Sequence, residues 1–175
     1  RTAAALRAAR GERLAAAECD RLARDPLFQA AARVREGLAD CFVAGAGRPT
    51  ADVLRAALWL IGTAPGVKTV SSFFLMIVPP VGGHAERAML FADCGVVPDP
   101  DPEQLADIAI ATADSYERLM RAVPHVAFLS FATRGSAEHP RVEKVREALK
   151  RARAKRPDRH FDGELQADAA LEPSV

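Results

Sequence analysis

The feature that most constrains this chain is a set of short apolar runs that alternate with stretches of helical periodicity. The runs are rich in β-branched and aromatic residues, which favours strands. They lie at 70–78, 88–92 and 126–131, and another begins at His160-Phe161. Helical patterns follow at about 103–121, 140–155 and 165–171. This alternation predicts an α/β fold, with mainly parallel sheets covered by helices. In such a fold Val70–Val78 should be a central strand buried on both faces, closed by a Pro/Gly turn at 79–83.

The first third of the chain is mostly helical in pattern. Residues 1–36 carry apolar stripes at helical spacing, with a boundary at Asp25-Pro26, because the residue before a proline avoids helical geometry. Cys41–Ala44 is a short apolar run between polar and glycine residues, and it predicts a buried strand. Thr50 is the expected N-cap of a helix that runs to Gly62.

The turn Ala64-Pro-Gly66 is the best hinge candidate in the sequence. We therefore expect residues 1–68 to form part of a first α/β domain, and residues 69–175 to form part of a second. The two parts should be separated by a cleft.

Composition excludes several classes of partner. The 24 basic and 23 acidic side chains give a net charge of +1, so neither nucleic acid nor a membrane surface is expected as a partner. The longest apolar run, Phe73–Pro80, is too short to span a bilayer. Three widely spaced cysteines without a CxxC motif favour a reducing cytoplasm over a disulfide framework or a zinc cluster, and no metal site is predicted.

The first candidate site is the turn and helix start from Gly45 to Arg55. A helix N-terminus attracts phosphate, the Thr50 hydroxyl can add a donor, and Arg55 can supply a bidentate charge. The glycine spacing matches neither the dinucleotide fingerprint nor the P-loop. The alternative is an ordinary turn with a solvated arginine, paired with Asp52 at i−3.

Two further candidates follow predicted strands, where ligands collect in open α/β sheets. The loop from Ser130 to Ser136 includes Arg134, and the stretch from Asp162 to Asp168 includes Glu164. Paired carboxylates can do acid–base work, although helix capping is the simpler role for them. Residues 141–159 carry an excess of basic side chains, which could bind polyphosphate or nucleic acid, or form a solvated helix face.

Three stretches, in this order and at these separations, together resemble a known family. They are Thr50-Ala-Asp-Val-Leu-Arg55 with Ile61–Val67; Leu90–Cys94 with Pro98–Pro100 and Glu103–Ala106; and Leu129–Ser136 with Val142–Arg146 and Asp162–Leu171. The likeness is to the phosphate acetyltransferases, or phosphotransacetylases, and it runs over nearly the whole chain, which would form the central part of a family member.

The resemblance implies acetyl transfer between acetyl phosphate and coenzyme A, by direct attack of the thiol on the acetyl carbonyl. It also implies a cytoplasmic homodimer of two α/β domains with the site in their cleft, without a bound cofactor. Thr50 and Arg55 match positions on the acetyl phosphate side, and Ser130, Arg134, Ser136 and Glu164 are candidate cleft residues.

Two departures qualify the resemblance. The family's Ser-Arg motif and nearby Asp, thought to hold phosphate and take the thiol proton, have no counterpart before Val175. The catalytic residues are therefore unassigned, and the 175-residue chain alone is expected to be nearly inactive. Pro49 stands where the family commonly has Ser or Thr, and Ala56 where it usually has Pro. The alternative is a non-catalytic acetyl-CoA-sensing module, of the kind appended to malic enzymes.

Overall fold

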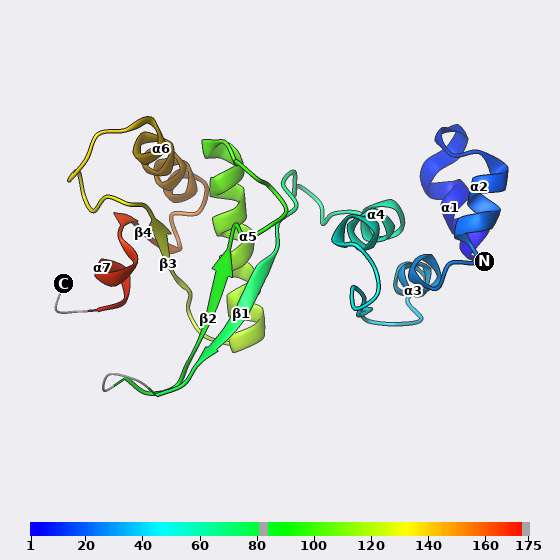
Figure 1. Ribbon diagram of the computed structural model, residues 1–175, viewed down its shortest axis with the longest axis horizontal. Helices are drawn as coiled ribbons and strands as arrows, with labels where there is room; N and C mark the ends of the chain where they lie inside the picture. Colours follow the sequence, from blue (N-terminus) through cyan, green and yellow to red (C-terminus); the bar gives the residue numbers. More distant parts are fainter. Residues whose placement is uncertain (81–83, 173–175) are drawn as a thin grey trace. The chain divides into compact units, whose positions relative to one another are not determined.

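The computed structural model describes residues 1–80 and 84–172, and the chain divides into two compact units (Figure 1). The first unit is Arg1–Gly66 and the second is Val67–Val175. The predicted turn at 79–83 lies partly outside the described residues. We predicted that the two units belong to two separate α/β domains, divided after residue 68. This stays a prediction.

The elements described in the first unit are all helical. They are α1 (Thr2–Arg10), a 3₁₀ turn (Gly11–Arg13), α2 (Ala16–Leu22), α3 (Pro26–Arg35) and α4 (Thr50–Leu60). The Asp25-Pro26 boundary is confirmed: the Asp25 side chain accepts a hydrogen bond from the Leu27 amide at 3.0 Å, and Pro26 opens α3. Leu6, Phe28 and Leu60 lie in one buried cluster that joins α1, α3 and α4.

The predicted strand at Cys41–Ala44 is wrong, because these residues have no regular secondary structure. Val43 is 97% exposed, so the run is not buried either. A strand needs a neighbour for its backbone groups, and none lies beside this segment in the described part of the chain. A four-residue apolar run carries no information about whether such a neighbour exists.

The second unit confirms the predicted alternation of strands and helices. Its elements are β1 (Phe73–Val78), β2 (Arg87–Ala92), α5 (Pro102–Met120), β3 (His125–Leu129), α6 (Pro140–Lys155), β4 (His160–Leu165) and α7 (Ala167–Leu171). Helix α5 begins with a capping box, in which Asp101 and Gln104 each accept a hydrogen bond from the other's amide.

The sheets differ from the prediction in two ways. β1 pairs with β2 antiparallel and β3 with β4 parallel, so the expectation of mainly parallel sheets is not confirmed. β1 is also not buried on both faces, since Phe74 to Ile77 are all exposed. Its only strand partner among the described residues is β2, and apolar composition alone does not bury a strand.

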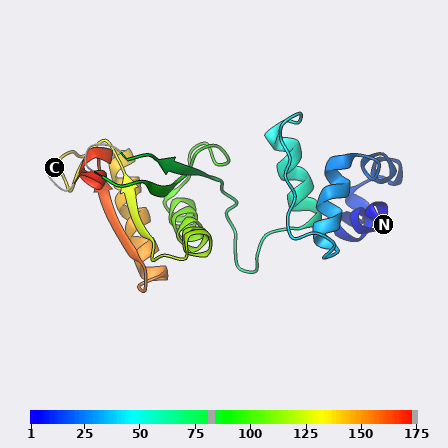
Figure 2. The same ribbon diagram turned by 90° about the horizontal axis from the view of Figure 1, so that it is seen from below.

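Helices α5 and α6 pack side by side, and both contact the β3–β4 pair (Figures 1 and 2). Phe128 and Phe161 meet edge to face, with ring centroids 6.2 Å apart, and Val145 and Leu149 of α6 pack in the same cluster. This cluster holds β3 and β4 in place and so positions the loops at their ends.

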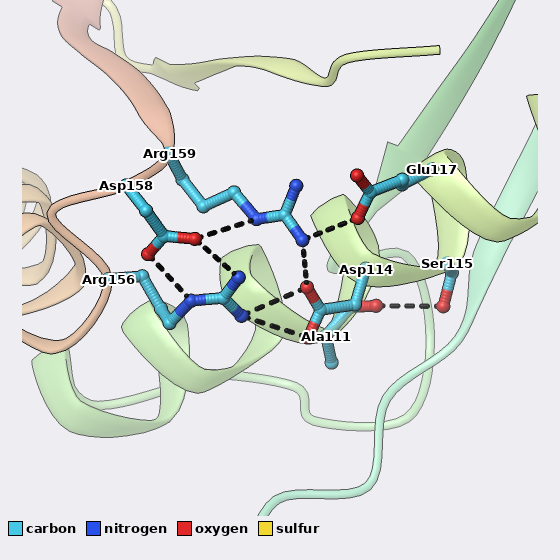
Figure 3. Close-up of polar contacts among 7 residues, drawn as sticks. All are labelled: Ala111, Asp114, Ser115, Glu117, Arg156, Asp158 and Arg159. Carbon is cyan, nitrogen blue, oxygen red and sulfur yellow. Dashed lines mark hydrogen bonds and ion pairs between the residues drawn. The ribbon is translucent and has the colours of Figure 1, made fainter. Parts of the chain in front are cut away.

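Ion pairs tie the end of α6 and the start of β4 to α5 (Figure 3). Asp114 accepts hydrogen bonds from Arg156 at 3.0 Å and from Arg159 at 2.9 Å, and Arg159 also reaches Glu117. Hydrogen bonding by Arg156 lowers the pKa of Asp158 to about 2. Many basic side chains of 141–159 are therefore engaged within the fold, which favours neither a nucleic-acid patch nor a merely solvated face.

Candidate functional site

The first candidate site lies at the start of α4. Pro49 is the N-cap residue, with φ −58° and ψ 143°, and Thr50 is already the first helical residue. The prediction that Thr50 caps the helix is therefore wrong. An N-cap residue must hold a non-helical backbone, and the proline does so here. No side chain caps this helix, and Thr50 is exposed at its first turn.

Arg55 lies on the same helix and is about half exposed. Its guanidinium donates a hydrogen bond to Asp52 Oδ1 at 3.1 Å, which is the i−3 pair named above as the simpler alternative. A guanidinium carries five N–H donors, so this single contact leaves donors for an anion. The predicted role of Thr50 and Arg55 on the phosphate side stays a prediction.

The second candidate site lies where β3 and β4 end. Because these strands are parallel, their carboxyl ends meet at one edge of the pair. The Ser130 amide donates to the Leu165 carbonyl at 2.8 Å, and the Arg134 amide donates to the Glu164 carbonyl at 3.0 Å. The structure therefore brings the Ser130–Ser136 loop and the Asp162–Glu164 stretch together, although they are far apart in sequence.

Glu164 is the extra residue of an irregularity in this pairing. Phe128 pairs with Gly163 and Leu129 with Leu165, so Glu164 has no partner on β3. A bulge of this kind re-aims a side chain, and the Glu164 side chain is only 6% exposed. It accepts hydrogen bonds from the Gly135 amide at 2.7 Å and from Arg146 Nη2 at 3.0 Å.

The electrostatics of Glu164 exclude it as an acid near neutral pH. Hydrogen bonding by Arg146 lowers the pKa of this carboxyl to about 2, against the raising effect of burial. The carboxylate is thus charged at neutral pH, and its Oε1 accepts both of these hydrogen bonds. Through these contacts Glu164 ties the Ser130–Ser136 loop to α6, and its predicted cleft role stays a prediction.

Gly163 permits the close approach of β4 to β3 beside Glu164. Its φ is +143°, and a Cβ at this position would lie 2.7 Å from the Phe128 carbonyl oxygen and 2.8 Å from Phe128 Cβ. Both the backbone angle and the contact require a residue without a side chain. Glycine at position 163 is therefore a packing requirement of this strand pair.

The Ser130–Ser136 loop places the Arg134 side chain at the surface. Arg134 is 70% exposed and pairs with Asp162 at 3.0 Å. The Ser136 hydroxyl accepts a hydrogen bond from the Thr133 amide at 2.9 Å, which shapes the turn. Arg134 presents donors to solvent from the loop that follows β3, where an anionic ligand could meet them. The predicted cleft role of Ser130, Arg134 and Ser136 stays a prediction.

Sequence reasoning assigned no role to two residues that build this edge. Arg146 bridges Glu143, Glu164 and the Ala137 carbonyl, and Thr133 accepts a hydrogen bond from the Gln166 amide at 2.9 Å. The available signal was Glu164 within a predicted strand region, because a glutamate needs a cationic partner if it is buried. Nothing in the spacing identifies Arg146 as that partner.

Among the residues described, no group of three or more His, Cys, Asp and Glu side chains could hold a metal ion. In the same part of the chain, none of the helices is long and apolar enough to cross a membrane.

The chain belongs to the phosphate acetyl/butaryl transferase family, whose pattern matches residues 1–175. It is 53% identical over 152 residues to a phosphate acetyltransferase of Paracoccus denitrificans, covering 87% of this chain and 48% of that protein. It is 47% identical over 156 residues to one of Clostridium acetobutylicum, covering 89% of this chain and 47% of that protein.

Two solved structures are similar over nearly all of this chain. The EutD phosphotransacetylase from Staphylococcus aureus has a TM-score of 0.84 and 32% identity, with 99% of this chain and 52% of that chain covered. A phosphotransacetylase from Streptococcus pyogenes has a TM-score of 0.85 and 37% identity, with 99% and 51% covered. The chain thus spans about half the length of the relatives it matches.

Proposed function

We propose that the protein carrying this chain transfers an acetyl group between acetyl phosphate and coenzyme A. The observation that carries this proposal is the family match over residues 1–175, together with 53% identity to a phosphate acetyltransferase. In the proposed reaction the CoA thiol attacks the acetyl carbonyl, the bond from the acetyl carbon to the phosphate oxygen breaks, and phosphate departs.

The proposed roles divide between the two candidate sites. Arg55 and Thr50 act on the phosphate side, where a departing phosphate needs donors as its charge develops. Ser130, Arg134 and Ser136 line the cleft on a loop that Glu164 positions. The group that takes the thiol proton is supplied from outside these 175 residues.

Further parts of the proposal concern the setting of the reaction. CoA and acetyl phosphate enter as substrates, and no resident cofactor or metal is required. We place the protein in the cytoplasm as a homodimer, with no role for nucleic acid or a membrane.

The test is formation of acetyl-CoA from acetyl phosphate and CoA by the polypeptide that the complete reading frame encodes. Saturable turnover is expected with acetyl phosphate, and slower turnover with butyryl phosphate. The 175-residue chain alone should be about 10²–10⁴-fold slower, because general-base help is missing. Comparable turnover by the short chain would contradict this division of roles.

Pro49 favours a second candidate, the non-catalytic acetyl-CoA-sensing module. The proline occupies the N-cap of α4, where a hydroxyl of the commonly found Ser or Thr would face a phosphate. In that case the complete protein would bind acetyl-CoA in a calorimetric titration and form no product from acetyl phosphate. A dehydrogenase domain upstream in the reading frame would support the same reading.

A further inference from the structure

The loop that follows β3 holds two consecutive residues in a left-handed backbone conformation. Arg134 has a φ of +44° and Gly135 a φ of +86°. Glycine adopts this conformation freely, but for an arginine it costs free energy and persists only where the surroundings impose it. Strained residues of this kind cluster at functional sites. The contacts that impose the turn therefore also decide where the Arg134 side chain points.

Both backbone amides of this turn are bound by one residue of β4. The Arg134 amide donates to the Glu164 carbonyl at 3.0 Å, and the Gly135 amide donates to Glu164 Oε1 at 2.7 Å. The Ser136 amide donates back to the Thr133 carbonyl at 3.0 Å, which closes the loop. The left-handed turn therefore depends on where the Glu164 carboxylate is held.

Arg146 of α6 holds that carboxylate. Its Nη2 donates to Glu164 Oε1 at 3.0 Å, which is the same oxygen that accepts the Gly135 amide, and to the Ala137 carbonyl at 3.3 Å. Its Nη1 donates to Glu143 at 3.1 Å, one turn earlier on α6, and this contact orients the guanidinium. One arginine thus holds both the acceptor of the turn and the end of the loop.

We propose that Arg146 is a positioning residue for the binding of a substrate phosphate group. Through Glu164 it holds the left-handed turn, and the turn directs the Arg134 guanidinium at the phosphate. Arg134 suits this role because it is 70% exposed and has five N–H donors, of which its pair with Asp162 uses only part. The inference rests on the proposed function and adds to it a residue that contacts no substrate.

The test is steady-state formation of acetyl-CoA by variants of the complete polypeptide. Acetyl phosphate and CoA both carry phosphate, so each is varied in turn to show which of them meets Arg134. Arg146→Gln should raise one of the two KM values by about 10-fold or more, since a small displacement of a binding group weakens its contact strongly. Unchanged KM values for both substrates would overturn the proposal.

Arg151→Gln is the matched control for Arg146→Gln. Arg151 also lies on α6 and also pairs with two carboxylates, those of Glu103 and Glu147. Its substitution should leave both KM values unchanged, because neither partner contacts the turn. An equal rise in KM for the Arg151 and Arg146 variants would overturn the proposal.

A double-mutant cycle with Arg134→Ala separates positioning from a merely structural role. If Arg146 acts through Arg134, Arg146→Gln raises the KM in the wild type but not in the Arg134→Ala background. An equal rise in both backgrounds would overturn the proposal. Arg146→Lys is the second variant should Arg146→Gln fail to fold. Its ammonium cannot reproduce the planar fork that reaches Glu143 and Glu164 together, so a smaller rise in the same KM is expected.

Binding measurements separate this proposal from the proposed function. Inorganic phosphate and CoA are titrated separately by calorimetry into the wild type, Arg134→Ala and Arg146→Gln. If the complete polypeptide forms no acetyl-CoA, the proposed function fails, while weaker binding of one ligand by both variants would still support the role of Arg146. Acetyl-CoA formation with equal binding by all three proteins would keep the function and overturn the proposal. Binding of neither ligand by the wild type would overturn it as well.

Discussion

The start of α4 and the carboxyl edge of β3–β4 are both polar, yet they are built differently. At α4, Arg55 is half exposed, and its one ion pair within the described residues is with Asp52 of its own helix. At the β3–β4 edge, Glu164 is buried and joined to a loop amide and to Arg146 of α6. A group that binds substrate must keep donors free, whereas a group whose contacts are all satisfied holds structure. This difference supports the proposal that Arg55 binds a ligand and that Glu164 positions the loop.

The largest expected effect tests the proposed phosphate-binding role of Arg55. In the complete protein, Arg55→Ala should lower kcat/KM for acetyl phosphate by about 100-fold, as the loss of one anion-stabilising donor does. Arg55→Lys should restore only part of the activity, because an ammonium cannot make a bidentate contact. Steady-state kinetics with varied acetyl phosphate measure both. Full activity of the lysine variant would show that only charge matters.

The next effect concerns the fold at the β3–β4 edge. Gly163→Ala should destabilise the protein by about 3 kcal/mol, because its Cβ would overlap Phe128 and its φ is positive. Gly95→Ala is the matched control, since a Cβ there meets nothing within 4 Å. Urea unfolding of both variants measures the difference. Equal midpoints would contradict the close packing described for Gly163.

A smaller loss, with a defined pH dependence, is expected at Glu164. Glu164→Gln should cost about 2 kcal/mol at pH 7, because a charged buried contact is lost. The folded-state pKa of about 2 lies below the ordinary 4.5, so the folded protein binds fewer protons. The stabilisation is therefore complete above about pH 4.5 and is lost as the pH falls toward 2.

The difference between wild type and Glu164→Gln should shrink over that pH range in urea unfolding series. Glu143→Gln serves as the control, since Glu143 contacts the same Arg146 but is 70% exposed. A difference between wild type and Glu164→Gln that stays constant from pH 7 to pH 2.5 would contradict the lowered pKa of Glu164.

The smallest effect is expected at Asp52. Asp52→Ala removes a surface pair at i−3, so stability should fall by only about 0.5 kcal/mol. The activity of the complete protein should be kept, because Arg55 remains free to meet phosphate. Thermal unfolding and the acetyl-CoA assay measure the two quantities. A large loss of activity would mean that Asp52, and not an anion, is the functional partner of Arg55.

The sequence predicted the elements of the second unit because their patterns are local. Helix α6 was expected at 140–155 and α5 at about 103–121, close to the observed bounds, since apolar spacing and capping residues lie within each helix. The Ser130–Ser136 loop and the Asp162–Glu164 stretch were each placed after a predicted strand, but their meeting was not predicted, because it depends on β3 and β4 being neighbours.

The errors arose where structure depends on neighbours that a local pattern does not contain. Apolar composition made β1 look central, but four of its six residues are exposed, and among the described residues it pairs only with β2. Thr50 has the chemistry of an N-cap, yet the backbone of Pro49 decides where the helix starts. The pairing of Glu164 with Arg146 is a tertiary contact across 18 residues that no spacing rule reveals.

The central claim is that Arg55 binds the phosphate side of the substrate, and Arg21 offers a matched control. Arg21 pairs with Glu18 at i−3 and is 67% exposed, so Arg21→Ala removes the same kind of surface contact from the same unit. The decisive measurement is kcat/KM for acetyl phosphate in the complete protein carrying either substitution. We predict a value about 100-fold lower for Arg55→Ala than for Arg21→Ala, with equal unfolding midpoints. Equal kcat/KM values would contradict the claim and leave Arg55 as a solvated side chain.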